Sequence, residues 1–151
     1  MKTRVFYASQ TGNTKKIAAS IASALGVEPE SVGEAGGPIE ADLLFIGGAV
    51  YATHDHGIKP ELARFIANLD PRKVGKAAIF CTGFEDRASG ILRGLLASKG
   101  IPIVEQHFFC KGKFFLFNLG HPGTADLEAA HAFALRVGGK GEAGKTRKGR
   151  A

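Results

Sequence analysis

Two stretches of this 151-residue chain combine glycine with residues that can hold a phosphate group. Near the C-terminus, residues 139–146 fit the spacing G-x-x-x-x-G-K-[ST], in which backbone amides and a lysine bind a nucleotide triphosphate. Near the N-terminus, residues 9–14 read SQTGNT and offer hydroxyl and amide donors around a single glycine. Both stretches suggest phosphate binding, so the elements on either side of each must decide between them.

The C-terminal stretch lies in the wrong context for a triphosphate loop. Such a loop joins a buried strand to the start of a helix, so that its amides converge on the phosphates. Here a helical pattern precedes Gly139, and only five residues follow Thr146. A segment of this kind cannot hold its amides in register against its own chain entropy. We interpret the match as accidental, and expect a domain at residues 1–137 followed by a basic, disordered tail at residues 138–151.

The N-terminal stretch has the right context, because it follows an apolar strand pattern at residues 5–7 and precedes an amphipathic helix pattern at residues 14–25. Helix starts leave several amides unpaired and favour an anion. The stretch adds three hydroxyls, a side-chain amide and a conformationally free glycine, from Ser9, Thr11, Thr14, Asn13 and Gly12. It contains no Lys or Arg, so it predicts a neutral cradle for a terminal phosphate monoester. A plain helix cap of Ser, Thr and Asn fits the same residues equally well.

Strand-like and helix-like patterns alternate along the rest of the domain. Further strands are expected at residues 27–32 (weakly, because of Pro29), 42–50, 76–83 and 101–104 with a continuation toward 109. Further helices are expected at residues 58–69, 86–99 and 126–137. This alternation predicts an α/β fold, a doubly wound five-stranded parallel sheet with helices on both faces. Ligands of such sheets bind at the carboxyl ends of the strands, where SQTGNT, GGAVYATHDHG and CTGFED follow the first, third and fourth strands.

The composition is that of an ordinary globular domain, with 44% hydrophobic and 23% charged residues. No apolar run has the length of a membrane span, and the start MKTRVFYASQ lacks the apolar core of a signal peptide, so we expect a cytoplasmic protein. From Gly138 onward the charge is +4, which leaves +2 of the total +6 for the domain. A basic tail can bind acidic surfaces nonspecifically, and no specific nucleic-acid binding is expected. Cys81 and Cys110 are interpreted as free, partly buried thiols, with a disulfide as the alternative.

One cysteine also fits a different chemistry. Cys81 and Arg87 have the C-x5-R spacing of a thiol phosphatase loop, and an Asp-Pro pair of the kind used by low-molecular-weight phosphatases occurs at Asp70. Against this interpretation, Glu85 and Asp86 would lie inside the phosphate cradle, where like charges repel. The loop would also follow the fourth strand, whereas those enzymes place it after the first.

Two further clusters have a chemical and a structural interpretation. His54 and His56 resemble part of a metal site, but two imidazoles need at least one more ligand, so we interpret them as loop histidines. Aromatic residues interleaved with lysine resemble a surface for single-stranded nucleic acid. We favour packing of the last strand for these residues, which are Phe108, Phe109, Phe114, Phe115 and Phe117 with Lys111 and Lys113.

The stretch VFYASQTGNTKKIA resembles the phosphate loop of flavodoxins, whose pattern after the first strand is [ST]-x-T-G-x-T. The resemblance extends to DLLFIGGAVYA and KAAIFCTGF and covers nearly all of residues 1–137. It implies a sheet of order 2-1-3-4-5 and one noncovalently bound FMN. It also implies an electron carrier that works with separate redox partner proteins, a reductase and an acceptor. An FMN-dependent NAD(P)H quinone or nitro reductase and a cofactor-free interaction module are the alternatives.

The resemblance also assigns residues to the cofactor. The phosphate would be held by Ser9, Gln10, Thr11, Gly12, Asn13 and Thr14. Ala49, Val50 and Tyr51 would line one side of the flavin ring, and Thr82, Gly83 and Phe84 the other. The chain departs from the family in having no Trp, in offering Phe84 where a Tyr is usual, and in being basic rather than acidic. No catalytic side chain and no metal ligand are expected.

Overall fold

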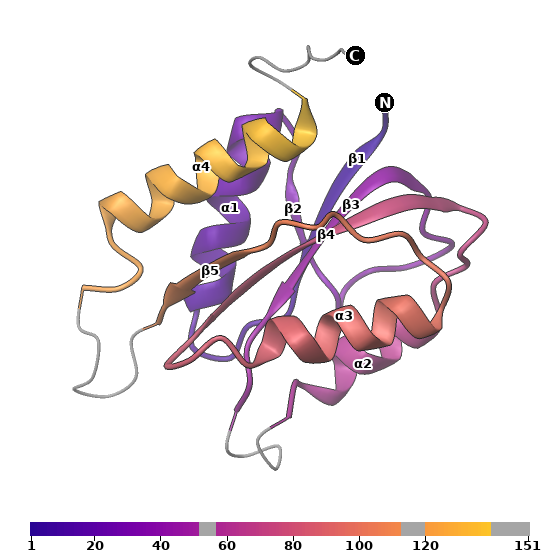
Figure 1. Cartoon of the computed structure of the whole chain (residues 1–151), viewed down its shortest axis with the longest axis horizontal. Helices are drawn as coiled ribbons and strands as arrows, with labels where there is room; N and C mark the ends of the chain where they lie inside the picture. Colours follow the sequence, from indigo (N-terminus) through magenta and orange to yellow (C-terminus); the bar gives the residue numbers. More distant parts are fainter. Residues whose placement is uncertain (52–56, 113–119, 140–151) are drawn as a thin grey trace.

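The computed structural model describes residues 1–51, 57–112 and 120–139. Strands and helices alternate along this chain, as Figure 1 shows. Their order is β1 (Thr3–Tyr7), α1 (Asn13–Leu25), β2 (Pro29–Ser31), β3 (Ala41–Gly48), α2 (Pro60–Ala67), β4 (Val74–Gly83), α3 (Ala88–Ser98), β5 (Phe108–Lys111) and α4 (Thr124–Gly138). The expected tail at residues 140–151 and the histidine pair at 54 and 56 lie outside the described residues.

The five strands form one parallel sheet of order β2-β1-β3-β4-β5. This confirms the α/β class and the predicted strand order. The long central strands β3 and β4 are apolar without alternation because both faces of the sheet are covered. The consequence is that the loops after β1, β3 and β4 leave the same edge of the sheet close to one another.

Two helix pairs cover the sheet, with α1 and α4 on one face and α2 and α3 on the other (Figure 1). Ile17 and Ile21 of α1 pack with Phe133 of α4 against one face of the sheet. Leu62 of α2 and Leu92 of α3 belong to the core on the other face. All five side chains are essentially inaccessible to solvent. Burial of the apolar side chains of α1 therefore fixes this helix against the sheet, and with it the position of the loop that precedes the helix.

The last strand differs from its expected position. Only Ile103 forms a bridge to Ala77, and the strand proper begins five residues later at Phe108. Pro102 has no N–H to offer a neighbouring strand, although its carbonyl accepts a hydrogen bond from Ala77 at 2.8 Å. The exposed Glu105 then lies outside the sheet, where its carbonyl accepts a 3.1 Å hydrogen bond from Arg93. The expected strand at 101–104 is therefore wrong in its start and right in its continuation toward 109.

The other boundaries differ less. The second strand is real but short and lies at the edge of the sheet, where Pro29 is tolerated. α2 ends at Ala67 instead of Leu69, and α4 begins at Thr124, two residues before the expected Asp126. Each shift concerns the end of an element, where sequence periodicity carries the least information.

Both cysteines are buried and free. In the register of the sheet Cys81 is paired with Phe109, and Thr82 is paired with Cys110. Successive side chains of a strand point to opposite faces, so the two thiols belong to cores on opposite sides of the sheet. This excludes the disulfide alternative. Of the predicted aromatic cluster, Phe108 packs in the core, whereas the three phenylalanines at 114, 115 and 117 lie outside the described residues.

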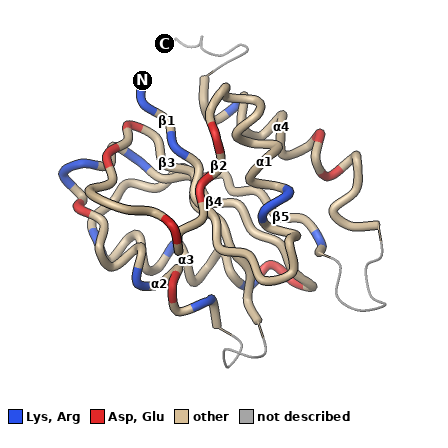
Figure 2. Tube along the Cα trace, turned by 180° about the vertical axis from the view of Figure 1, so that it is seen from behind, with Lys and Arg blue, Asp and Glu red and all other residues tan. Residues whose placement is uncertain are grey.

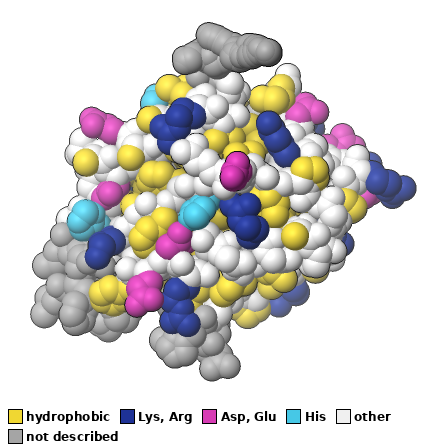
Figure 3. All heavy atoms as spheres, viewed as in Figure 1, with side chains coloured by type: hydrophobic (Ala, Val, Ile, Leu, Met, Phe, Trp, Pro, Cys, Tyr) yellow, Lys and Arg dark blue, Asp and Glu magenta, His cyan; other side chains and the backbone are white. Residues whose placement is uncertain are grey.

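Acidic and basic residues are interspersed along the described chain (Figure 2). The face seen in Figure 3 likewise mixes hydrophobic, basic, acidic and histidine side chains, and no single kind covers it. No helix in the described part of the chain is long and apolar enough to cross a membrane.

Candidate functional site

The stretch between β1 and α1 forms a tight loop that starts the helix. Gly12 is its N-cap and adopts a left-handed backbone, with φ at 91°, and its carbonyl accepts the first helical hydrogen bond from Lys16 at 3.1 Å. An added Cβ at Gly12 would meet nothing within 4 Å, so glycine is required by the backbone angle and not by crowding. Open space therefore borders the loop at the point where the helix begins.

Side chains of the loop organise its amides. Ser9 Oγ accepts hydrogen bonds from the backbone N–H of Gly12 at 3.1 Å and of Lys15 at 3.4 Å. Asn13 Nδ2 donates to Thr11 Oγ1 at 2.8 Å. The N-cap residue Gly12 has no side chain to cap the helix, so Ser9 binds two amides of the helix start in its place, and these bonds fix the direction in which the loop presents its donors.

The first turn of α1 has an unusual charge. It contains no acidic residue, whereas Lys15 and Lys16 are both exposed there. Cations are disfavoured at the positive end of a helix dipole, and a helix built only for stability would place Asp or Glu at these positions. The combination favours an anionic ligand beside the loop.

The turn after β3 reaches back to this loop through Tyr51. Its phenol oxygen accepts a hydrogen bond from the backbone N–H of Gln10 at 3.1 Å. Tyr51 is tied in its turn by a bridge to Gly57, whose carbonyl accepts the Tyr51 N–H at 3.0 Å. Burial raises the pKa of the Tyr51 phenol, against opposing contributions from the Gln10 amide and the Thr14 hydroxyl. Tyr51 is therefore held neutral and in contact with the loop.

The end of β4 meets the same loop from the other side. Thr14 and Thr82 are both buried, and their Oγ1 atoms lie 2.9 Å apart. Phe84 directly follows the last residue of β4, and 53% of its surface is exposed, which is unusual for an aromatic residue. Gly83 accepts a 3.3 Å hydrogen bond from the N–H of Gly112 at the end of β5.

The structure thus brings most of the expected site residues to one edge of the sheet. Hydrogen bonds connect Gln10 with Tyr51 and Thr14 with Thr82. Ala49 is buried and Val50 is partly buried at the end of β3. Tyr51 and Thr82, which are expected on the two sides of the flavin ring, both contact the loop at residues 9–14.

One neighbour of the loop was not anticipated from the sequence. A Cβ at Gly112 would lie 2.6 Å from Asn13 Nδ2, so the end of β5 packs directly against the side chain of Asn13. In the sequence Gly112 is a single glycine among lysine and phenylalanine residues, and this pattern does not predict the contact. It follows only from the pairing of β5 with β4.

The phosphatase interpretation does not fit the environment of Cys81. A thiol nucleophile needs to be accessible and easily ionised. The side chain of Cys81 has no exposed surface, and burial, assisted by the charge of Asp86, raises its pKa. Cys81 is therefore an inert core residue. Among the described residues, no three His, Cys, Asp or Glu side chains are grouped to hold a metal ion.

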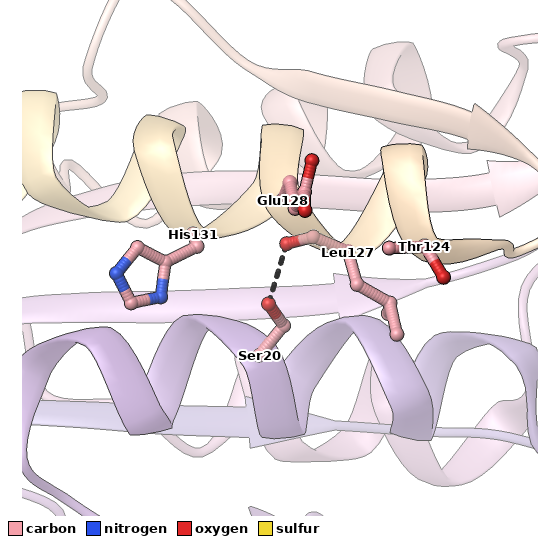
Figure 4. Close-up of a pocket in the computed structure, with 5 residues that line it drawn as sticks. All are labelled: Ser20, Thr124, Leu127, Glu128 and His131. Carbon is pink, nitrogen blue, oxygen red and sulfur yellow. Dashed lines mark hydrogen bonds between the residues drawn. The ribbon is translucent and has the colours of Figure 1, made fainter.

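A separate hollow of about 370 Å³ lies between α1 and α4 (Figure 4). It is lined by Ser20, Thr124, Leu127, Glu128 and His131. Ser20 Oγ donates to the carbonyl of Leu127 at 2.6 Å across it. Ser20 lies about two turns along α1 from the loop, so this hollow belongs to the packing of two helices and not to the strand ends.

The comparisons with known proteins agree with this geometry. The family model of the flavodoxin domain matches residues 4–100, so the chain belongs to the flavodoxin domain family. No curated protein matches the chain.

Solved structures share the fold at low sequence identity. A flavodoxin from the domain Archaea is 17% identical with a TM-score of 0.68, and the match covers 89% of this chain and 94% of that chain. Oxidised flavodoxin 2 from Bacillus cereus is 22% identical with a TM-score of 0.67, over 89% and 96% of the two chains. A mutant flavodoxin from Fusobacterium nucleatum, solved with flavin mononucleotide bound, is 16% identical with a TM-score of 0.65, over 91% and 96%.

Proposed function

We propose that this flavodoxin-like protein binds one FMN and transfers electrons between redox partner proteins. The observation that carries the proposal is the start of α1. There a left-handed Gly12 opens onto free space, the first turn carries Lys15 and Lys16, and acidic residues are missing from that turn. A phosphate dianion would satisfy the helix amides and remove the unfavourable charge pattern.

The residues present fit the rest of the cofactor. Ser9, with its oxygen already accepting from two amides, keeps its own proton for donation to a phosphate oxygen. Tyr51 and Phe84 are aromatic residues at the same edge of the sheet, and they would flank a planar flavin ring as its walls. Ala49, Val50 and Gly83 would supply apolar surface and backbone groups near that ring. The flavodoxin from Fusobacterium nucleatum, solved with flavin mononucleotide bound, supports FMN as the ligand.

When bound, FMN supplies one- and two-electron redox chemistry that protein side chains cannot perform. The protein binds and orients the cofactor, and limits access of water to one face of it. Phe84, with its exposed ring, marks the surface on which a redox partner would approach. The buried, unpaired thiols fit a reducing compartment, and we propose a cytoplasmic location.

The proposal is tested with full-length protein purified with FMN supplied, followed by a visible spectrum and a reductive titration. We expect a bound yellow cofactor whose reduction proceeds in two separate one-electron steps. Protein that stays colourless with added FMN contradicts the proposal and favours a cofactor-free interaction module. Rapid NADPH consumption with a quinone, without any added reductase, contradicts the carrier role and favours a reductase.

A further inference from the structure

Thr14 and Thr82 form a buried pair of hydroxyls. Their exposed fractions are 0% and 2%, and their Oγ1 atoms lie 2.9 Å apart although the residues are 68 positions apart in sequence. With Ser89, they are the buried polar or charged residues in the part of the chain that the structure describes. A buried hydroxyl that loses its partner costs free energy, so each of the two fixes the other.

The two residues belong to parts of the fold with different rigidity. Thr82 lies in β4, which is paired with β3 as far as Cys81 and with β5 at its end, where Thr82 is the partner of Cys110. Thr14 lies in the first turn of α1, directly after the loop that starts the helix. The hydroxyl of Thr14 also interacts with the Tyr51 phenol, which in turn accepts the Gln10 amide. Hydrogen bonds therefore link the end of β4 to Thr14 at the start of α1, and Tyr51 to the backbone of the loop at Gln10.

We propose that Thr82 is a positioning residue for the phosphate loop and acts through Thr14. Its hydroxyl strengthens binding of the phosphate monoester and has no part in binding the flavin ring. This inference rests on the proposed function and changes one detail of it, because the family resemblance assigns Thr82 to the ring side of the site. Thr82 itself has only 2% of its surface exposed, and its hydroxyl contacts the hydroxyl of Thr14 at the end of the loop.

The chemical consequence is a difference between two ligands. FMN and riboflavin share the ring, and only FMN carries the phosphate. A residue that acts through the phosphate loop affects binding of FMN alone, whereas a residue that contacts the ring affects both ligands equally. The ratio of the two dissociation constants therefore separates the two roles of Thr82.

The experiment compares wild-type protein with Thr82→Val and Thr82→Ser by flavin fluorescence titration with FMN and with riboflavin. Valine keeps the shape of threonine and removes the 2.9 Å hydrogen bond between the Thr82 and Thr14 hydroxyls, so we expect FMN affinity to fall about tenfold. Riboflavin affinity is expected to change less than about twofold, and Thr82→Ser to restore FMN affinity. Ser20→Ala, which removes a hydroxyl hydrogen bond between α1 and α4, serves as the matched control and is expected to change neither.

A double-mutant cycle with Thr14→Val tests whether the effect passes through Thr14. In the Thr14→Val background, Thr82→Val is expected to cause no further loss of FMN affinity. Equal losses for both ligands, no loss for either, or full additivity overturn the inference. Should Thr82→Val not fold by circular dichroism, Thr82→Ala is measured in its place against the same expectations. Wild-type protein that binds neither flavin overturns the proposed function itself, which is a distinct result.

Discussion

The backbone N–H of Gln10 donates a 3.1 Å hydrogen bond to the phenol oxygen of Tyr51, 41 residues further along the chain. This contact joins the loop before α1 to the turn after β3, two segments that share no strand pairing of their own. It makes Tyr51 a support of the loop that we propose to bind phosphate, as well as a candidate wall for the flavin ring. The two roles use different parts of the side chain, so they can be separated by substitution.

Tyr51→Ala and Tyr51→Phe separate the ring from the hydroxyl. If the aromatic ring is a wall of the flavin site, Tyr51→Ala lowers the affinity for both FMN and riboflavin by about tenfold, through lost stacking and buried area. Tyr51→Phe retains the ring, and riboflavin affinity is expected to stay within about twofold of wild type. Unchanged riboflavin affinity in Tyr51→Ala would show that the ring lies elsewhere. Fluorescence titration of both flavins measures these effects.

Gly112→Ala is expected to weaken FMN binding without unfolding the protein. The added methyl group would lie 2.6 Å from Asn13 Nδ2, so the flexible amide must swing away and lose its 2.8 Å hydrogen bond to Thr11. We expect a fall in FMN affinity of about three- to tenfold, which corresponds to the loss of one such bond.

Gly94→Ala is the control for this substitution. A Cβ at Gly94, within α3, meets nothing within 4 Å. Alanine in a helix interior stabilises the folded state by roughly 0.5–1 kcal/mol relative to glycine, so thermal unfolding should occur at a higher temperature with FMN affinity unchanged. Equal FMN affinity in Gly112→Ala and Gly94→Ala would contradict the role given to the contact between Gly112 and Asn13.

Cys81 and Cys110 are expected to be unreactive toward thiol reagents at pH 8 in the folded protein and to react together on unfolding. Burial raises the pKa of both thiols, that of Cys110 to about 12 from an ordinary value of 9.0. Between pH 9 and 12 the unfolded chain therefore releases protons that the folded chain retains, and the free energy of unfolding falls as pH rises. Rapid labelling of either thiol at pH 8 under native conditions would contradict their burial.

Asp126→Ala is expected to destabilise the protein at neutral pH by about 1 kcal/mol, since its carboxylate accepts a 2.8 Å hydrogen bond from the N–H of Gly123 at the start of α4. Burial alone raises the pKa of Asp126, but the Gly123 amide and the adjacent His121 outweigh it and lower the pKa below 3.8. The carboxylate thus stabilises the fold above this pH, and its contribution is lost as pH falls through the lowered pKa. The difference between wild type and variant in urea unfolding should shrink toward zero in acid. A difference independent of pH would contradict this assignment.

Sequence periodicity was sufficient for the order of elements, because strands buried on both faces and helices with one apolar stripe have distinct patterns. It was also sufficient for the position of the loop at Ser9–Thr14, since a glycine between an apolar strand and an amphipathic helix has few alternatives. Periodicity did not predict the start of β5 correctly. The apolar run at 101–104 has the pattern of a strand but contributes only the isolated bridge of Ile103 to the sheet.

The contacts that other elements make with the loop before α1 and with the first turn of that helix could not be predicted from the sequence. The pairing of Thr14 with Thr82 and the approach of Gly112 to Asn13 depend on strand register and on the seating of α1 against the sheet. Neither leaves a local pattern, because threonine and glycine occur at many other positions. The resemblance to flavodoxins named Thr82 as a site residue, and only the three-dimensional arrangement showed that its hydroxyl faces the loop.

The central claim is that the loop at the start of α1 binds the phosphate of a flavin nucleotide, and the most direct test is the ratio of FMN to riboflavin affinity in the wild-type chain. Each hydrogen bond to a charged group contributes about 1.5–3 kcal/mol, so two loop donors predict FMN binding at least about a hundredfold tighter than riboflavin. Equal dissociation constants for the two flavins, or binding of neither, would contradict the account.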